Sequence, residues 1–232
     1  MTGARWAAVI VAAGRGERFG RPKQLVELDG LPMVGWSMRT FAQMPEVAEI
    51  VVATEPEWTR EVGDAFARLA PGRIARVVEG GATRQDSVRN GLRAVPGSCN
   101  AVLVHDGARP LVRADDVRAA MREVRDGRAA LLAERAVDTM KRVDPATLRV
   151  LETVDRATLW AAQTPQFATA ADFRRAHAAA ERDGVHATDD AALLERIGVE
   201  VVVVPATHAN FKVTLPEDMA RAQALLRGSE AR

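Results

Sequence analysis

Apolar runs of strand length alternate along the chain with stretches of helical period. The strand-like runs read "WAAVIVAA", "EIVVA", "IARVV", "AVLVH" and "AALLA". Between them, apolar positions recur at helical spacing over residues 32–41, 57–69, 85–94 and 115–124. Strands that are apolar throughout and alternate with helices are typical of a parallel sheet covered on both faces. The pattern therefore predicts an α/β fold, with a three-layer, mostly parallel twisted sheet flanked by helices.

The alternation breaks at about Val137. Two short segments of alternating polarity surround "VDPAT", where the pair Asp144-Pro145 favours a turn. We therefore expect a protruding β-hairpin arm at about residues 137–160, within a single domain spanning 1–232. Such an arm could lie over a partner subunit. Beyond it, the pattern predicts helices over about 171–182 and 189–197, a strand at "VEVVVV" and a last helix opened by Pro216.

Size and charge narrow the function classes. A chain of 232 residues can bury one sizeable core, and 32 basic against 31 acidic side chains leave a net charge of +1. This balance gives no general attraction to nucleic acid or membrane, so any anion site must be local. The single cysteine, Cys99, cannot form an internal disulfide, which favours a cytoplasmic protein.

The N-terminal "RWAAVIVAAG" resembles a short secretory segment. However, no apolar run approaches the roughly 18 residues of a spanning helix. The run also leads directly into a loop rich in glycine and arginine rather than into a polar mature start. We therefore interpret it as the first buried strand.

The loop after this strand has the composition of an anion site. Gly14, Gly16 and Gly20 permit close backbone approach, so that successive N–H groups can form a nest. Arg18 and Lys23 add full positive charges suited to phosphate oxygens. Because ligands of open α/β sheets bind beyond the carboxyl ends of the strands, the loop predicts a polyphosphate site. A solvated loop with surface cations is the alternative interpretation.

The sequence does not match several well-known motifs for nucleotide binding, hydrolysis or zinc binding. The third glycine comes one residue late for a dinucleotide fingerprint, and no acid follows about 20 residues later to hold a ribose. No G-K-[ST] completes a P-loop, and no G-x-S-x-G is present. The four histidines are scattered and lack the spacing of a zinc site.

Two later segments also carry polar chemistry. "VHDGARP" follows a strand, which brings Asp106 and Arg109 to the same sheet edge as the first loop. Asp106 could bind a metal or hydroxyl groups and Arg109 a phosphate, although a turn salt bridge would explain the pair equally well. His105 is expected to be a packed residue at the strand end. "GGATRQDSV" supplies a second glycine turn whose exposed backbone suits recognition of a base edge.

These segments together carry a resemblance to a known family. "AAGRGERFG" followed by "PKQ" is similar to the signature loop of sugar-phosphate nucleotidyltransferases. With "GGATRQDSV", "VHDGARP", "DTMK", "TVDR", "QTPQ", "TDDA" and "FKVTLPED", the chain from Ala12 to Asp218 resembles the 2-C-methyl-D-erythritol 4-phosphate cytidylyltransferase family. The resemblance implies a Rossmann-like nucleotidyltransferase fold. It also implies transfer of a cytidylyl group from CTP to 2-C-methyl-D-erythritol 4-phosphate, with release of pyrophosphate, in non-mevalonate isoprenoid biosynthesis.

The resemblance also implies roles for individual residues. Catalytic roles fall to Arg18, Lys23, Arg156 and Lys212. Substrate contacts fall to Ala12, Ala13, Gly14, Gly16, Gly81, Arg84, Ser87, Asp106, Arg109 and Thr139. In the family the arginine that matches Arg156 reaches into the neighbouring subunit's site, which implies a homodimer joined through the arm. Mg²⁺ or another divalent cation is expected with the triphosphate, and no protein ligand is assigned to it.

The chain departs from the family pattern at two places. Glu134 and Arg135 stand where small or apolar residues and a proline are common, and Gly107 stands where alanine is common. Two rival functions remain open at this stage. A ribitol 5-phosphate cytidylyltransferase would share the loop and the leaving group. A catalytically silent nucleotide-binding subunit would be expected to lack Lys23 or Lys212, and both are present.

Overall fold

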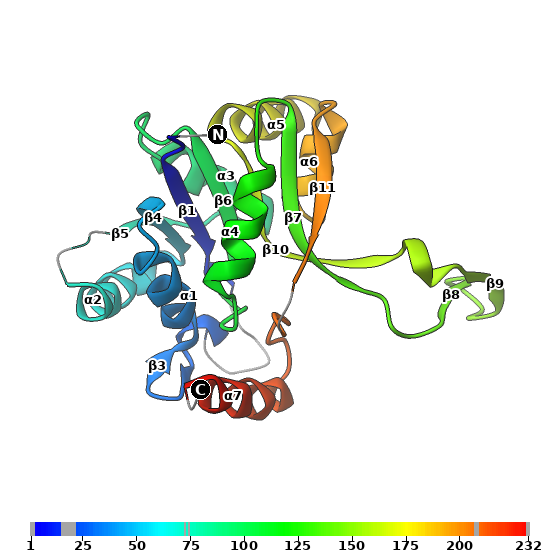
Figure 1. Ribbon diagram of the computed structural model, residues 1–232, viewed down its shortest axis with the longest axis horizontal. Coiled ribbons are helices and arrows are strands. Elements are labelled where there is room, and N and C mark those ends of the chain that lie inside the picture. The colour runs from blue at the N-terminus through cyan, green and yellow to red at the C-terminus, as the bar shows by residue number, and fades with distance from the viewer. Residues whose placement is uncertain (1–2, 15–21, 72, 74, 207–208, 231–232) are drawn as a thin grey trace.

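The computed structural model describes residues 3–14, 22–71, 73, 75–206 and 209–230. Its largest sheet contains β1 (Trp6–Val11), β4 (Val47–Thr54), β5 (Ala75–Glu79), β6 (Ala101–Asp106), β7 (Arg128–Arg135), β10 (Trp160–Thr169) and β11 (Glu200–Pro205). These strands lie in the order β11-β7-β10-β6-β1-β4-β5 (Figure 1). Two small sheets pair β2 (Glu27–Leu28) with β3 (Leu31–Pro32), and β8 (Met140–Val143) with β9 (Val150–Val154).

The helices follow the predicted stretches closely. They are α1 (Met33–Ala42), α2 (Thr59–Leu69), α3 (Arg84–Ala94), α4 (Ala114–Glu123), α5 (Ala170–Asp183), α6 (Asp190–Arg196) and α7 (Pro216–Glu230). Short 3-10 turns occur at η2 (Lys23–Leu25), η3 (Pro56–Trp58) and η4 (Arg156–Thr158). Among the described residues, no helix combines the length and the apolar character needed to cross a membrane.

The side chains of β1 divide the core into two halves. Trp6, Ala8 and Ile10 pack in one apolar cluster with residues of α1, α2 and α4. Their neighbours in sequence point to the opposite face and pack in a second cluster with residues of α3, α5 and α6. Because successive residues of a strand face opposite sides, one apolar strand is buried on both. The predicted three-layer architecture is thereby confirmed.

One strand of the large sheet was not predicted. β10 lies between β6 and β7 and runs antiparallel to both, whereas the pairings β1–β4, β1–β6, β4–β5 and β7–β11 are parallel. Its sequence "WAAQTPQFAT" has no strand-like period because Gln163, Thr164 and Gln166 are polar yet buried. Their hydrogen-bond partners come from distant segments, so local pattern could not identify the strand. The sheet is mostly parallel, as predicted.

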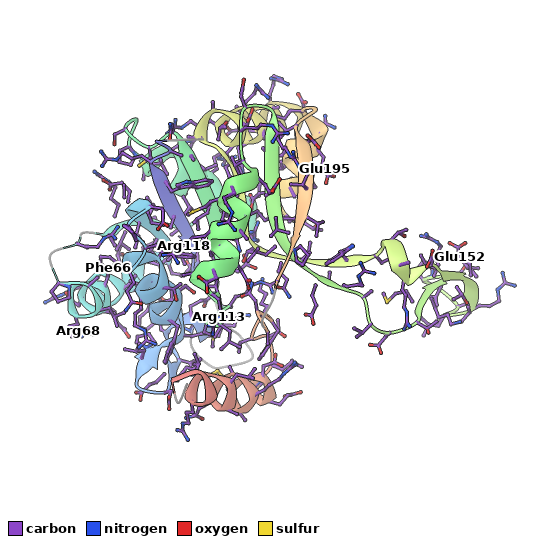
Figure 2. All side chains as sticks on the ribbon, in the orientation of Figure 1. Phe66, Arg68, Arg113, Arg118, Glu152 and Glu195 are labelled. Carbon is purple, nitrogen blue, oxygen red and sulfur yellow. The ribbon has the colours of Figure 1, made fainter. Side chains whose placement is uncertain are left out.

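The predicted hairpin arm is present. β8 and β9 pair antiparallel, and the segment that carries them extends away from the large sheet (Figure 1). Figure 2 shows Glu152 on this arm, where it forms an ion pair with Arg142. Several large apolar side chains of the arm are exposed: Val137, Met140, Val143, Leu148, Val150 and Leu151. The arm therefore has almost no core of its own in the single chain.

The strand order creates a crevice at one edge of the sheet. From β1 the chain passes to β4 and β5 on one side, and then returns to β6 on the other side of β1. Such a reversal between neighbouring parallel strands is a topological switch point, and ligands of open α/β sheets bind there at the carboxyl ends. Ala12, Ala13 and Gly14, which begin the predicted loop after β1, and the predicted Asp106 lie at this edge.

Candidate active site

The carboxyl ends of β1 and β6 lie directly beside each other. Val11 is in register with Asp106, and the Gly107 N–H donates a hydrogen bond of 2.9 Å to the Val11 carbonyl. A Cβ at Gly107 would lie 3.1 Å both from that carbonyl oxygen and from a methyl group of Val34. The glycine that departs from the family pattern therefore fits a crowded crossing more easily than alanine would.

Gly80 brings the second glycine turn onto the first loop. Its N–H donates to the Thr54 carbonyl at 2.7 Å, and an added Cβ would lie only 2.1 Å from the Cβ of Ala13. No other residue type permits this approach without a backbone shift. The backbones after β1 and β5 are consequently neighbours, as a site built from both loops requires.

The predicted nucleotide residues Gly81 and Ser87 hold this turn together. The Gly81 N–H donates to Ser87 Oγ at 3.0 Å, and the same hydroxyl donates to the Thr83 carbonyl at 2.9 Å. Thr83 and Asp86 form a reciprocal capping box at the start of α3. Ser87 is completely buried. Its local role is thus structural, and a nucleotide contact by Gly81 or Ser87 stays a prediction.

The structure joins three predicted site residues in one ionic cluster. Arg84 Nε lies 2.9 Å from Asp106 Oδ1, and Lys212 Nζ lies 2.9 Å from Asp106 Oδ2. These residues come from α3, the end of β6 and the segment before α7, far apart in sequence. Each oxygen of the Asp106 carboxylate therefore faces a different cation.

The electrostatics of the cluster keep Asp106 and Arg84 charged. Burial opposes ionisation of Asp106, but the attraction of Arg84 and Lys212 outweighs it and holds the pKa of this carboxyl below its usual range. Burial likewise disfavours the charged form of Arg84, yet two carboxylates raise its pKa. Asp106 therefore remains ionised and holds Arg84 and Lys212 in place.

Two further predicted cations converge on the segment that carries Lys212. Arg109 Nη1 donates to the Asn210 carbonyl at 2.7 Å, and Lys23 Nζ donates to the Val213 carbonyl at 2.9 Å. The Val213 N–H in turn donates to the Ala108 carbonyl at 2.8 Å. Burial lowers the pKa of Arg109. Three basic side chains, Arg84, Arg109 and Lys212, thus lie around the Asp106 carboxylate. Lys23 is bonded to the segment that carries Lys212, and this group of cations suits a polyanionic ligand.

His105 is a packed residue of the strand end, as expected. It is completely buried, its Nε2 lies 3.1 Å from the Arg109 carbonyl, and its Nδ1 lies 3.2 Å from Thr164 Oγ1. Burial lowers the pKa of His105 to about 4. Because a carbonyl only accepts, the neutral ring carries its proton on Nε2, and Nδ1 accepts from Thr164. Thr164 Oγ1 also accepts from the Asp106 N–H at 3.0 Å, so His105 braces the backbone around Asp106.

Two predicted residues lie on the arm, away from this cluster in a single chain. Thr139 and Arg156 are exposed, and the Arg156 guanidinium donates to the Val137 carbonyl. Figure 1 shows β8 and β9 well separated from the carboxyl edge of β6. The predicted Gly16 and Arg18 lie outside the described residues. Ala12, Ala13 and Gly14 follow β1 at the edge, as expected.

Sequence reasoning missed residues that support the cluster. Asp190 and His177 lie behind Arg84, and the Asn210 side chain donates to the Thr164 carbonyl at 2.8 Å. Motifs containing Thr164 and Asp190 were recognised in "QTPQ" and "TDDA", but no roles were assigned to these two residues. Arg84 lies 106 residues from Asp190, and Asn210 lies 46 residues from Thr164, so local spacing could not pair them.

The fold and the site define a class of protein. A three-layer α/β sheet that gathers cations and glycine turns at its switch point is the architecture of a nucleotidyltransferase. The profile of the family described as 2-C-methyl-D-erythritol 4-phosphate cytidylyltransferase matches residues 6–228. The chain belongs to this family.

Individual relatives agree with this assignment. The chain is 45% identical to the 2-C-methyl-D-erythritol 4-phosphate cytidylyltransferase of Streptomyces avermitilis, with 97% of this chain and 93% of the relative covered. It is 38% identical to the enzyme of that name from Halalkalibacterium halodurans, with 98% and 99% covered.

Solved structures show the same fold. The 4-diphosphocytidyl-2C-methyl-D-erythritol synthase of Anaerococcus prevotii superposes with a TM-score of 0.87 at 27% identity, covering 97% of each chain. The 2-C-methyl-D-erythritol 4-phosphate cytidylyltransferase of Thermus thermophilus superposes with a TM-score of 0.75 at 34% identity, covering 95% of this chain and 98% of the other.

Proposed function

We propose that the chain joins CTP and 2-C-methyl-D-erythritol 4-phosphate to give 4-diphosphocytidyl-2-C-methyl-D-erythritol and pyrophosphate. This reaction belongs to the non-mevalonate route to isoprenoid precursors. A phosphate oxygen of the acceptor attacks the α-phosphorus of CTP, a new P–O bond forms, and the bond to the bridging oxygen of the β-phosphate breaks. The observation that carries the proposal is the convergence of Arg84, Arg109 and Lys212 around Asp106, with Lys23 bonded to the backbone of the segment that carries Lys212.

The work of this site is positioning and charge stabilisation, since phosphoryl-type transfers need no protein nucleophile. Two polyanions must come together, and negative charge then develops on the leaving pyrophosphate. Lys23 and Lys212 would supply point charges for these oxygens. Lys23 Nζ donates to the Val213 carbonyl and Lys212 Nζ to the Asp106 carboxylate, at 2.9 Å in both cases, so substrate phosphate would replace or extend one hydrogen bond and one ion pair.

The nucleotide would bind over the two glycine turns. Ala12, Ala13 and Gly14 leave β1 directly beside Gly80, so one ligand at this edge of the sheet would lie against both turns. Gly16, Gly81, Arg84 and Ser87 complete this assignment by resemblance. Arg18 would add a guanidinium against the triphosphate, as the family resemblance implies.

The acceptor would bind toward Asp106 and Arg109, with Thr139 and Arg156 supplied by the arm of a second copy. Support comes from the arm itself, whose Val137 and Leu148 are 72% and 75% exposed. Apolar side chains in such numbers on a two-stranded hairpin favour burial against another surface. A homodimer with exchanged arms would place Arg156 in the partner's site and bury these side chains together.

A divalent cation, Mg²⁺ by preference, would accompany the triphosphate and offset part of its negative charge. Mg²⁺ retains several waters and is commonly held by substrate phosphates plus one or two carboxylates. The described residues contain no cluster of three or more metal-ligating side chains. Asp106, the carboxylate at the site, is already bonded to Arg84 and Lys212. We therefore assign no protein ligand to the ion.

The remaining assignments are a single domain over 1–232, with the arm at about 137–160, and a cytoplasmic location. The proposed location is supported by Cys99, which is free and buried. One cysteine cannot form a disulfide within the chain, and such disulfides are the typical feature of proteins in oxidising compartments.

Pyrophosphate release by the purified protein tests the function. CTP and Mg²⁺ are supplied with 2-C-methyl-D-erythritol 4-phosphate, with ribitol 5-phosphate, or with no acceptor. Release with the methylerythritol phosphate alone, abolished by EDTA and restored by Mg²⁺, is expected. Release with ribitol phosphate alone would keep the transfer chemistry and overturn the acceptor, and silence with both would overturn the reaction.

A further inference from the structure

A second buried carboxylate stands behind the cationic cluster. Asp190 is 1% exposed, its Oδ2 lies 2.9 Å from Arg84 Nη1, and its Oδ1 lies 3.0 Å from His177 Nε2. Arg84 therefore bridges two carboxylates, with Asp106 on its Nε and Asp190 on its Nη1. The result is a chain of alternating charge from Asp190 through Arg84 and Asp106 to Lys212.

The fold fixes Asp190 through the start of α6. The side-chain carbonyl of Gln166, on β10, accepts from the backbone N–H groups of Asp190 and Ala191 at 2.9 and 2.8 Å. The amide nitrogen of Gln166 donates to Asp189 Oδ2 at 2.8 Å, and Asp189 caps the helix through its other oxygen. A polar anchor in the large sheet thus sets where the Asp190 carboxylate points.

A carboxylate at this depth is costly unless its oxygens are paired. Both oxygens of Asp190 are paired, and its guanidinium partner is the one that also contacts Asp106. Removing Asp190 would leave Arg84 attracted to Asp106 alone, and its planar group would then rotate about that remaining contact. This rotation would also shift Asp106 and, through it, Lys212, because Asp106 lies 2.9 Å from Lys212 Nζ.

We propose that Asp190 is a positioning residue for the transfer reaction. With His177, it holds the Arg84 guanidinium in the orientation that places Asp106 and Lys212 for the two substrates. This inference rests on the proposed function for its catalytic consequence and on the observed geometry for the positioning itself. Arg84 is assigned to the nucleotide and Asp106 to the acceptor under the proposed function. Asp190 would therefore influence the binding of both substrates.

A purely structural carboxylate would behave differently on mutation. It would reduce the amount of folded protein, and hence kcat per total protein, without changing either KM of the molecules that fold. A positioning residue changes KM for both substrates in the folded molecules. Displacement of a reacting constellation by about 1 Å can cost on the order of 100-fold in rate.

The test compares Asp190→Asn with a matched control, Asp172→Asn. Asp172 is also 1% exposed and lies 2.8 Å from an arginine, Arg175. Its partner Thr169 pairs with Ala101 at the beginning of β6, so Asp172 belongs to the edge of the sheet opposite Asp106. Both variants lose a buried charge, but only one of them adjoins Arg84.

Two readouts are measured on folded protein. The first is kcat and KM for CTP and for the acceptor, normalised to the folded fraction from circular dichroism. The second is independent of activity: the NMR resonance of the Arg84 Nε–H group, assigned by its loss in Arg84→Lys. We expect Asp190→Asn to raise both KM values, to lower kcat/KM by about 10- to 100-fold, and to move the resonance. Asp172→Asn should change neither readout, and Asp190→Glu, which retains the charge, should recover part of the loss.

His177→Gln provides a second, milder variant in case Asp190→Asn does not fold. It removes the imidazole contact to Asp190 without removing a charge from Arg84, and a smaller change in the same direction is expected. Unchanged KM values and an unmoved Arg84 resonance in the folded variants would overturn the proposal. A wild-type protein that releases no pyrophosphate would overturn the proposed function alone, and the resonance would still decide the positioning role.

Discussion

Lys212 Nζ lies 2.9 Å from Asp106 Oδ2, although 106 residues separate them in the chain. The carboxylate is 10% exposed, whereas the lysine side chain is 38% exposed. The buried Asp106 carboxylate therefore holds the more exposed Lys212 ammonium group at the carboxyl edge of the sheet. The pair does more for ligand binding than for stability, because partly exposed ion pairs contribute little to folding.

Lys212→Ala should accordingly impair turnover while leaving the fold stable. Loss of one preorganised charge at a site of developing negative charge typically costs about 100-fold or more in kcat. Pyrophosphate release measures the rate and thermal unfolding measures the stability. Arg227→Ala, which removes an exposed partner of Asp29 at 3.0 Å, serves as the control and should leave kcat unchanged. Near-normal turnover of Lys212→Ala would remove this lysine from the proposed chemistry.

Refolding two impaired variants together tests whether the arm completes a neighbouring site. Lys23→Ala is expected to abolish turnover and Arg156→Ala to impair use of the acceptor, each with the fold intact. If the arms exchange, a heterodimer of the two variants contains one site with both residues intact. Equal mixing should then restore about a quarter of the wild-type activity.

The control for this experiment is each variant refolded alone, which should regain nothing. The contrary result is a refolded mixture that forms dimers by size-exclusion chromatography but is no more active than the separate variants. Arg156 would then act in the site of its own subunit or in neither site.

Gly80→Ala should destabilise the fold through one identifiable clash. The new Cβ would lie 2.1 Å from the Cβ of Ala13, and overpacking of this kind costs about 1–3 kcal/mol. The double variant Gly80→Ala/Ala13→Gly removes the opposing Cβ and should recover most of that loss in urea unfolding. Gly97→Ala, where an added Cβ meets nothing within 4 Å, is the control. If the double variant were no more stable than Gly80→Ala, the close approach of the two turns would not be the cause.

His105 should make the free energy of unfolding depend on pH. Its pKa is about 4 in the folded protein and about 6.5 when unfolded. Between these values the unfolded chain binds the extra proton, so stability rises with pH and is lost as pH falls from 6.5 toward 4. The loss between pH 7 and pH 5 should be about 2 kcal/mol.

Urea unfolding at both pH values, compared with His105→Gln, isolates this contribution. Glutamine retains a side-chain donor and acceptor but has no charge to gain in this range. An equal pH dependence in the two proteins would show that other groups cause it and that His105 is not held neutral.

Much of this protein follows from its sequence. The alternation of apolar strands and amphipathic helices determines three layers, because each pattern has only one way to bury its apolar face. The carboxyl ends of β1, β5 and β6 had to lie at one edge, because parallel strands share their direction. The turn residues Asp144 and Pro145 likewise marked the arm.

Only the tertiary structure decided which polar groups pair. β10 could not be recognised because Gln163, Thr164 and Gln166 are buried polar residues, and burial of such groups is tolerable only with partners supplied by other segments. The contacts Arg84–Asp190 and Asp106–Lys212 each span 106 residues. A hydrogen bond or an ion pair depends on the positions of two groups within a few tenths of an ångström. Periodicity along the chain therefore predicts which face of a strand or helix a residue lies on. Its hydrogen-bond or ion-pair partner is determined only by how the sheet and helices pack together.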